Sequence, residues 1–226
     1  TLNLGSNFNT TSVTNMSEMF YQTGREKLAT LNLGSNFNTA NVTNMSGMFN
    51  WMEKLTALNL GSKFDTNKVT DMNGMFQGVG NTATTSSINL GANFNTSKVT
   101  NMSNMFDNTG STAMTTLDLG DKFYTTSVTN MDNMFNGTGS SAMTLLDLGP
   151  AFTKIAGTYT NMFTNTGKSG SAVIYATESI FQTTKAFKLD TSSATTIAYT
   201  RGTINGRYRT EWIKQSVTYD TTNKTV

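Results

Sequence analysis

The sequence lacks the residues on which many catalytic and metal sites are built. None of its 226 residues is cysteine or histidine, which excludes disulfide bonds, thiol nucleophiles, Cys/His zinc sites and Ser-His-Asp triads. It has one proline, Pro150, so it is not a proline-rich stalk. No apolar run approaches ~20 residues, and we therefore predict no direct membrane insertion.

Charge is also scarce. Charged residues make up 13% of the chain, and the formal net charge is +2, which is too weak for electrostatic binding of nucleic acid. The glycine-containing segment Gly137–Ser141 lacks the spacing and the lysine of a phosphate-binding loop. We therefore predict no enzyme activity, no cofactor, no metal site and no nucleic-acid partner. Asn, Thr, Ser and Gly fill the polar positions, as is common on secreted proteins.

The main feature of the sequence is one motif that recurs along the chain. The octapeptide VTNMSGMF at Val42–Phe49 has near-copies at 13–20, 69–76, 99–106 and 128–135, and a decayed copy ends at Phe163. An apolar anchor residue precedes each copy, at offsets of 29, 27, 30, 29 and 29 residues. The anchors are Leu2, Leu31, Leu58, Ile88, Leu117 and Leu146. This period predicts a solenoid of six stacked units.

Each unit contains two patterns. LATLNLGSN at 28–36 fits the strand signature of leucine-rich repeats, with Leu31 and Leu33 facing inward and Asn32 outward. In the octapeptide, Val42, Met45 and Phe49 have the i, i+3, i+7 spacing of a helical stripe. We interpret the methionines as core filler rather than as a copper(I) site or an adaptable groove.

One unit cannot fold alone. Its roughly seven inward side chains contribute ~1.5–3 kcal/mol each, whereas ordering about 29 residues costs ~1–2 kcal/mol per residue. Stacking supplies the missing burial. We therefore expect one phenylalanine from each octapeptide to join a single buried column, formed by Phe20, Phe49, Phe76, Phe106 and Phe135.

The repeat resembles a known family. FNTANVTNMSGMF at 37–49, preceded by LNLGS, is similar to the 26-residue lipoprotein repeat of bacterial surface proteins, a BspA-like class of leucine-rich repeats, and the resemblance covers residues 1–163. It implies a right-handed solenoid with short strands on the concave face and short helices on the convex face. It also implies secreted or wall-anchored bacterial proteins without a shared catalytic site. The units here run a few residues longer than those of the family.

These features predict an α/β repeat fold. A leucine-rich-repeat solenoid of six units is expected over residues 1–170, followed by a β-rich C-terminal capping segment over residues 171–226, and Asn205-Gly206 favours a hairpin turn there. Whether this segment is a cap or begins another domain stays open. If it is a cap, a chain ending at Gly170 should melt at a lower temperature or aggregate, because the last coil would expose its apolar face.

Two surfaces are candidate binding sites. The first is a polar strip on the concave face, where two stacked carboxylates are too few for a calcium cage. It comprises Thr30, Asn32, Asn59, Asn89, Thr116, Asp118 and Asp147. The second is an aromatic and basic patch in a segment with seven Lys and Arg against four Asp and Glu. It could bind an acidic glycan or a partner, although such residues more often only cap a core. It comprises Arg201, Arg207, Tyr208, Arg209 and Trp212.

The function predicted is a non-enzymatic bacterial cell-surface module for adhesion or protein–protein interaction, or a rigid spacer. The alternative is a carbohydrate- or cell-wall-binding module that uses the Asn/Thr concave face. Ice binding is disfavoured because Ala57 and Leu145 interrupt the threonine column. The expected partner is a host or bacterial surface protein or a glycan. The chain, which opens in the middle of a repeat, is expected to be an extracellular fragment of a larger secreted or wall-anchored protein.

Overall fold

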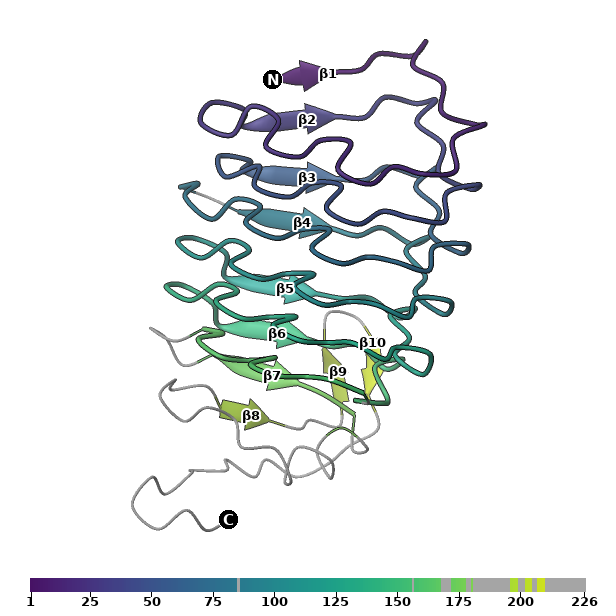
Figure 1. Cartoon of the computed structure of the whole chain (residues 1–226). Coiled ribbons are helices and arrows are strands. Elements are labelled where there is room, and N and C mark those ends of the chain that lie inside the picture. Colours follow the sequence, from purple (N-terminus) through teal and green to yellow (C-terminus); the bar gives the residue numbers. More distant parts are fainter. Residues whose placement is uncertain are drawn as a thin grey trace, which may run out of the picture.

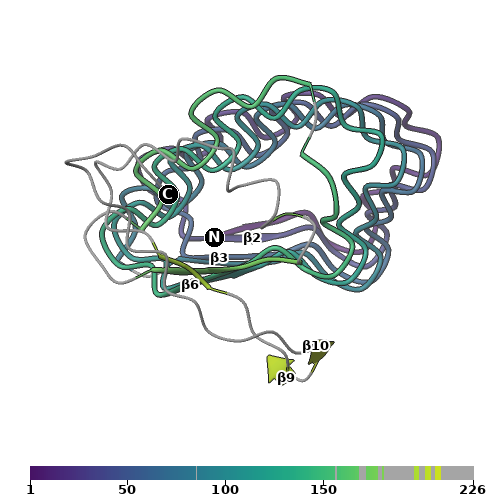
Figure 2. The ribbon, with the colours of Figure 1, turned by 90° about the horizontal axis from the view of Figure 1, so that it is seen from below.

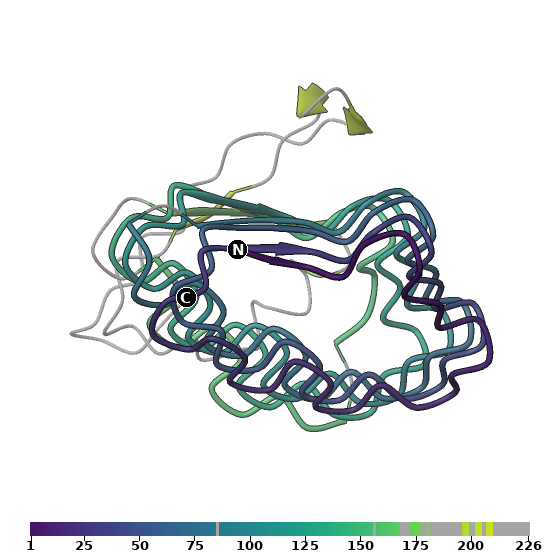
Figure 3. The same ribbon diagram turned by 90° about the horizontal axis from the view of Figure 1, so that it is seen from above.

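The chain winds into a parallel β-solenoid (Figure 1). The computed structural model describes residues 1–84, 86–155, 157–167, 172–177 and 180, together with the backbone of three short strands between 196 and 209. Seen along the axis, each coil is an elongated ring with its strand on one long side (Figures 2 and 3). The predicted solenoid of six repeated units is therefore confirmed.

Ten short strands are present in the described residues. They are β1 Leu2–Asn3, β2 Thr30–Asn32, β3 Ala57–Asn59, β4 Ser87–Asn89, β5 Thr116–Asp118, β6 Leu145–Asp147, β7 Val173–Tyr175, β8 Thr196–Ala198, β9 Gly202–Ile204 and β10 Arg207–Arg209. β1 to β4 form one parallel sheet, and β5 to β8 form a second one. Each predicted anchor lies opposite the next within a sheet, as Leu31 does opposite Leu58.

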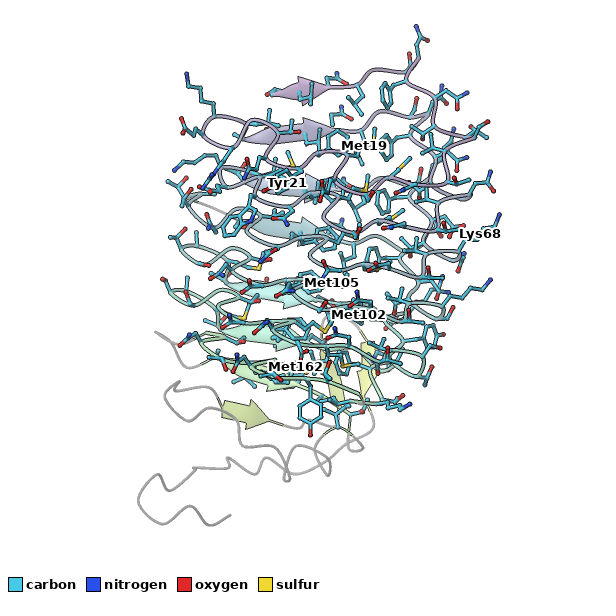
Figure 4. All side chains as sticks on the ribbon, viewed as in Figure 1. Met19, Tyr21, Lys68, Met102, Met105 and Met162 are labelled. Carbon is cyan, nitrogen blue, oxygen red and sulfur yellow. The ribbon has the colours of Figure 1, made fainter. Side chains whose placement is uncertain are left out.

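The core consists of columns that run along the axis. Leu31 and Leu33 are buried and Asn32 is exposed, as the alternation predicts. The predicted phenylalanine column is confirmed: its rings stack with centroids 5.6, 5.8, 5.2 and 5.5 Å apart from Phe20 to Phe135. The octapeptide methionines other than the partly buried Met19 are buried beside it, and Met102 and Met105 lie inside the coils while Lys68 projects outward (Figure 4).

The helices predicted over the octapeptides are wrong. An α-helix would direct each amide to the carbonyl four residues earlier. Instead, the amides of Met45, Gly47 and Phe49 donate to carbonyls of the next coil at 3.0, 2.7 and 3.0 Å. Between them, the amide of Met48 donates to the carbonyl of Met45 at 3.2 Å. This side of the coil is therefore a chain of tandem β-turns whose free amides bond along the solenoid axis.

Backbone dihedral angles explain why no helix forms. The residue before the second methionine of each copy has φ between 55° and 62°, which an α-helix does not allow and which the third position of a type II turn requires. These residues are Glu18, Gly47, Gly74, Asn104, Asn133 and Asn161. Five of the six are glycine or asparagine, the types that tolerate this region best. The i, i+3, i+7 spacing fits the tandem turns equally well.

Asparagine and aspartate side chains fix the corners of the coil. In the second coil, the side-chain oxygens of Asn32, Asn38 and Asn44 each accept the amide two residues later, at 2.9, 2.9 and 2.8 Å. Such Asx turns bend the backbone locally. A buried threonine joins neighbouring coils at one corner: Thr39 Oγ1 donates to the carbonyl of Asp65 and accepts its amide, both at 2.7 Å.

The C-terminal region first continues the parallel strand ladder and then contains an antiparallel pair of strands. β7 pairs with β6 in register, with Leu146 opposite Ile174, so the solenoid extends beyond residue 170. β9 and β10 pair antiparallel, as the two strands of the predicted hairpin should, and the turn residues Asn205 and Gly206 lie outside the described residues. The expectation that residues 171–226 cap the array stays a prediction.

Candidate functional site

The structure places the predicted concave strip on the strand side of the solenoid, where its residues are aligned within each of the two sheets. Asn59 lies opposite Asn89, and Asp118 lies opposite Asp147. Thr30 and Thr116 are exposed in the neighbouring column. The side-chain oxygens of Asn32, Asn59 and Asn89 accept amides of the glycines that follow, at 2.9, 3.0 and 3.0 Å. These oxygens therefore hold the turn after each strand, and the amide NH2 groups are what the column can offer a ligand.

The two aspartates of the strip differ in exposure from the asparagines. Asp118 is half-buried, and Asp147 is completely buried. Each accepts the amide of a glycine two residues later, at 2.9 and 3.0 Å. In the described residues, no group of three or more acidic side chains that would hold a metal ion comes together. The two carboxylates therefore serve mainly to accept the backbone amides of the turns that follow their strands.

The predicted C-terminal patch lies largely outside the described residues. Arg207, Tyr208 and Arg209 form strand β10, of which the structure describes the backbone alone. Arg201 and Trp212 lie outside the described residues. The patch stays a prediction.

A different aromatic and basic group lies on the turn side of the first two coils. Arg25 forms an ion pair with Glu53, and its Cζ lies 6.0 Å from the centroid of the Trp51 ring. Tyr21, labelled in Figure 4, is 44% exposed, and the Arg25 side chain is 49% exposed. Gln22 Nε2 donates to the Tyr21 hydroxyl at 3.0 Å. Tyr, Trp and Arg are the residue types enriched at energetically dominant positions of protein interfaces.

The backbone holds Trp51 in place. Its φ is 58°, a rare value for an aromatic residue, and a Cβ on Gly78 of the next coil would lie 2.4 Å from Trp51 Cε3. The ring thus packs on a glycine that leaves room for it. The amide of Gln22 donates to the carbonyl of Asn50 at 2.8 Å, which fixes the residues that follow Tyr21 beside those that precede Trp51. We call Tyr21, Arg25, Trp51 and Glu53 the aromatic–arginine cluster.

A family model described as "Mycoplasma protein of unknown function, DUF285" matches the chain twice, over residues 2–111 and 80–200. The chain belongs to the DUF285 family. No curated protein and no solved structure matches it significantly.

Sequence reasoning missed the aromatic–arginine cluster of this DUF285 chain because its members come from two coils. Arg25 and Glu53 are 28 residues apart, about one repeat, and that spacing was the signal available. The repeat period brings residues of adjacent units side by side, so each exposed position pairs with the one about 29 residues later.

A second group missed from the sequence is a buried polar network around Asp107. Its carboxylate accepts from Gln77 at 2.8 Å, from Asn108 at 2.9 Å and from Asn136 at 3.1 Å. Asp107 is 7% exposed. Burial raises its pKa above 3.8, and the three amide hydrogen bonds only partly oppose this shift. The network joins three coils of the solenoid, which indicates a structural role.

No helix in the described part of this DUF285 chain is long and apolar enough to cross a membrane.

Proposed function

We propose that this chain is a non-enzymatic interaction module, displayed on a bacterial cell surface, that binds another protein. The finer family assignment to the right-handed, BspA-like leucine-rich repeats of bacterial lipoproteins is part of this proposal. It is supported by the LNLGS segments of the first three units, by the VTNM segments at 13–16, 42–45, 99–102 and 128–131, and by the word "Mycoplasma" in the family's description. A solenoid that is hydrogen-bonded from coil to coil suits this task, because it holds a surface rigid.

The aromatic–arginine cluster carries the proposal. Tyr21 and Arg25 are substantially exposed, yet the ion pair with Glu53 and the contact with Trp51 restrict the guanidinium. A preorganised side chain loses less conformational entropy on binding than a free one. The concave strip contains no aromatic or arginine side chain. A protein partner on the cluster is therefore favoured over a glycan on the strip.

A binding screen with matched variants tests this proposal. The chain is immobilised and exposed to a panel of extracellular-matrix proteins, bacterial surface proteins and glycans. For a protein that binds, Tyr21→Ala combined with Arg25→Ala should weaken the affinity at least ~10-fold, since dominant interface side chains contribute about 2 kcal/mol or more each. Tyr124→Ala is the control, because Tyr124 is another exposed tyrosine, 37% accessible, that lies on a later coil.

The possible results separate the alternatives. Unchanged affinity in the double variant would assign the binding to another surface. Binding of glycans alone, lost on Asn32→Ala and Asn59→Ala, would favour the carbohydrate alternative. Surface display is tested separately by protease treatment of intact cells: resistance of the chain in intact cells and cleavage after lysis would contradict it.

A further inference from the structure

Charge is unevenly distributed around the solenoid, although the chain as a whole is close to neutral. We call the short side of the ring between the end of each strand and the start of the turn side the lysine edge (Figures 2 and 3). It comprises residues 5–14, 34–43, 61–70, 91–100, 120–129 and 149–155. The lysine edge has five lysines and two aspartates, a formal charge of +3, whereas the rest of residues 1–167 has three cations and eight carboxylates, a charge of −5. The net charge of the whole chain conceals this contrast.

The lysines are aligned because the repeat places equivalent residues of successive coils above one another. Lys68 and Lys98 each directly precede the buried valine of an octapeptide, in the third and fourth coils. Lys63 and Lys122 each directly precede a buried phenylalanine, in the third and fifth coils. These four side chains and that of Lys154 in the sixth coil are all exposed. Since neighbouring coils lie ~4.8 Å apart, the cations follow the solenoid axis at intervals of one or two coils.

Hydrogen bonds to uncharged oxygens of the preceding coil hold four of these ammonium groups in place. The acceptors are Asn36 Oδ1, Asn41 Oδ1 and the carbonyls of Ala92 and Thr126, for the Nζ atoms of Lys63, Lys68, Lys122 and Lys154, at 3.2, 2.8, 3.0 and 3.2 Å. The ion pair that the described residues form joins Arg25 and Glu53, away from this edge. The lysines are therefore restrained without being neutralised, and a restrained side chain loses less conformational entropy when a ligand binds.

Hydroxyl groups line the same edge. The threonine after each octapeptide valine is exposed in all five copies, as Thr14, Thr43, Thr70, Thr100 and Thr129. Four of these hydroxyls donate to a carbonyl of the preceding coil at 3.1–3.2 Å, so each presents its oxygen as an acceptor. The large apolar side chains exposed on the described edge are Phe8, in the first coil, and Tyr124. Two are too few for base stacking along a nucleic-acid strand or for insertion into a membrane surface.

We infer that the lysine edge binds a linear anionic polysaccharide, whose sulfate or carboxylate groups contact successive lysines along the solenoid axis. Hydroxyl groups of the polymer donate to the threonine oxygens between the lysines. A row of like charges attracts a polyanion most strongly at low ionic strength, because dissolved salt screens exposed charges. This function is additional to protein binding by the aromatic–arginine cluster, since Lys68 lies well away from Tyr21 (Figure 4).

Titration of the full chain with fluorescently labelled dextran sulfate tests the inference. Uncharged dextran of the same length is the control polymer, because it offers the hydroxyl groups without the charge. Dextran sulfate should bind and dextran should not. The affinity for dextran sulfate should fall ~10-fold or more between about 50 and 200 mM salt, as expected when several cations release the counterions of a polyanion.

Two matched double variants separate the lysine edge from the net charge. Lys68→Gln combined with Lys98→Gln should weaken dextran sulfate binding ~10-fold and reduce its dependence on salt, because two contacts are lost. The control is Lys27→Gln combined with Lys54→Gln, which removes the same charge from exposed positions outside the edge. Lys54 matches the edge lysines in its restraint, since its Nζ donates to the carbonyl of Thr82 at 3.2 Å. The control should bind like the wild type.

A gain of binding completes the test. Ser127 is exposed and occupies in the fifth coil the position that Lys98 has in the fourth, so Ser127→Lys should extend the column and tighten binding ~3-fold or more. Equal losses in the two double variants, or no binding of dextran sulfate at low salt, would overturn the lysine edge. Equally tight binding of a single-stranded oligothymidylate or of phosphatidylserine vesicles would overturn the assignment to a polysaccharide.

Discussion

Hydrogen bonds between neighbouring coils are continuous on the turn side of the solenoid at a level where strand pairing on the other long side is interrupted. On the turn side, the amides of Met102 and Asn104 bond to the fifth coil at 2.9 and 2.8 Å, at the same level where β4 and β5 fail to pair. The number of residues is constant from unit to unit on one part of the coil and varies on the other. Eighteen positions separate the anchor from the octapeptide phenylalanine in each of the first five units, whereas nine to twelve separate that phenylalanine from the next anchor. The ladder is continuous where the length is constant, and it breaks after the longest connection.

The largest expected effect comes from the turn-side core. Phe106→Ala should lower the free energy of unfolding by ~3–5 kcal/mol, because it leaves a cavity between the rings of Phe76 and Phe135. Reversible urea denaturation measures this loss. Phe8→Ala is the comparison, since Phe8 is 38% exposed and stacks on Phe37 alone. A loss below about 1 kcal/mol for Phe106→Ala would show that the column does not hold the coils together.

On the strand side, two glycines with the same backbone conformation should respond differently to alanine. Gly34 and Gly61 have φ of 78° and 79°, so each substitution carries a strain of ~1–2 kcal/mol. A Cβ on Gly34 would lie 2.1 Å from the carbonyl oxygen of Gly5, whereas one on Gly61 meets nothing within 4 Å. Gly34→Ala should therefore cost ~1–3 kcal/mol more by overpacking. Equal melting temperatures of the two variants would contradict this close stacking of the coils.

Asp107 should make the turn side sensitive to pH. Its pKa is raised on folding because the carboxylate is buried, so the folded chain binds a proton more readily than the unfolded chain. The wild type should therefore gain stability relative to Asp107→Asn as the pH falls from neutral through the folded pKa, and the gain should be complete below about 3.8. Urea denaturation of both proteins across this range measures the difference. The opposite slope would mean that the three amides stabilise the charged carboxylate beyond its desolvation cost.

The smallest effect is expected at the surface of the turn side. Arg25→Ala removes the ion pair with Glu53, and an exposed pair of this kind contributes ~0–1 kcal/mol. Thermal melting at low and high salt should show little change, with any loss confined to low salt. A loss of several kcal/mol would give the cluster a structural role and weaken its assignment as a binding surface.

Much of the fold was predictable because each position of the repeat unit occupies the same environment in every stacked coil, so its residue type recurs along the sequence. The period, the inward leucines and the phenylalanine column all follow from residues that recur at one spacing, and the structure confirms them. The turn-side conformation did not follow, since a stripe at i, i+3 and i+7 fits both a helix and tandem turns. Glycine or asparagine before the second methionine was the available signal. Of the candidate sites, the strip of strand residues is aligned within each of the two sheets but not between them, Asp147 is buried, and the Asx turns that occupy its oxygens were not foreseen.

The sequence by itself determined that the chain stacks, how many units it has and which side chains fill the core, because one unit cannot bury enough apolar surface alone. Only the tertiary structure decided where the main-chain amides donate. In an isolated turn these amides have no preferred acceptor. In the stacked solenoid, the amides of Met45 and Phe49 donate to carbonyls of the next coil at 3.0 Å. The same holds for the aromatic–arginine cluster, since its ion pair and its ring contact form only between two coils.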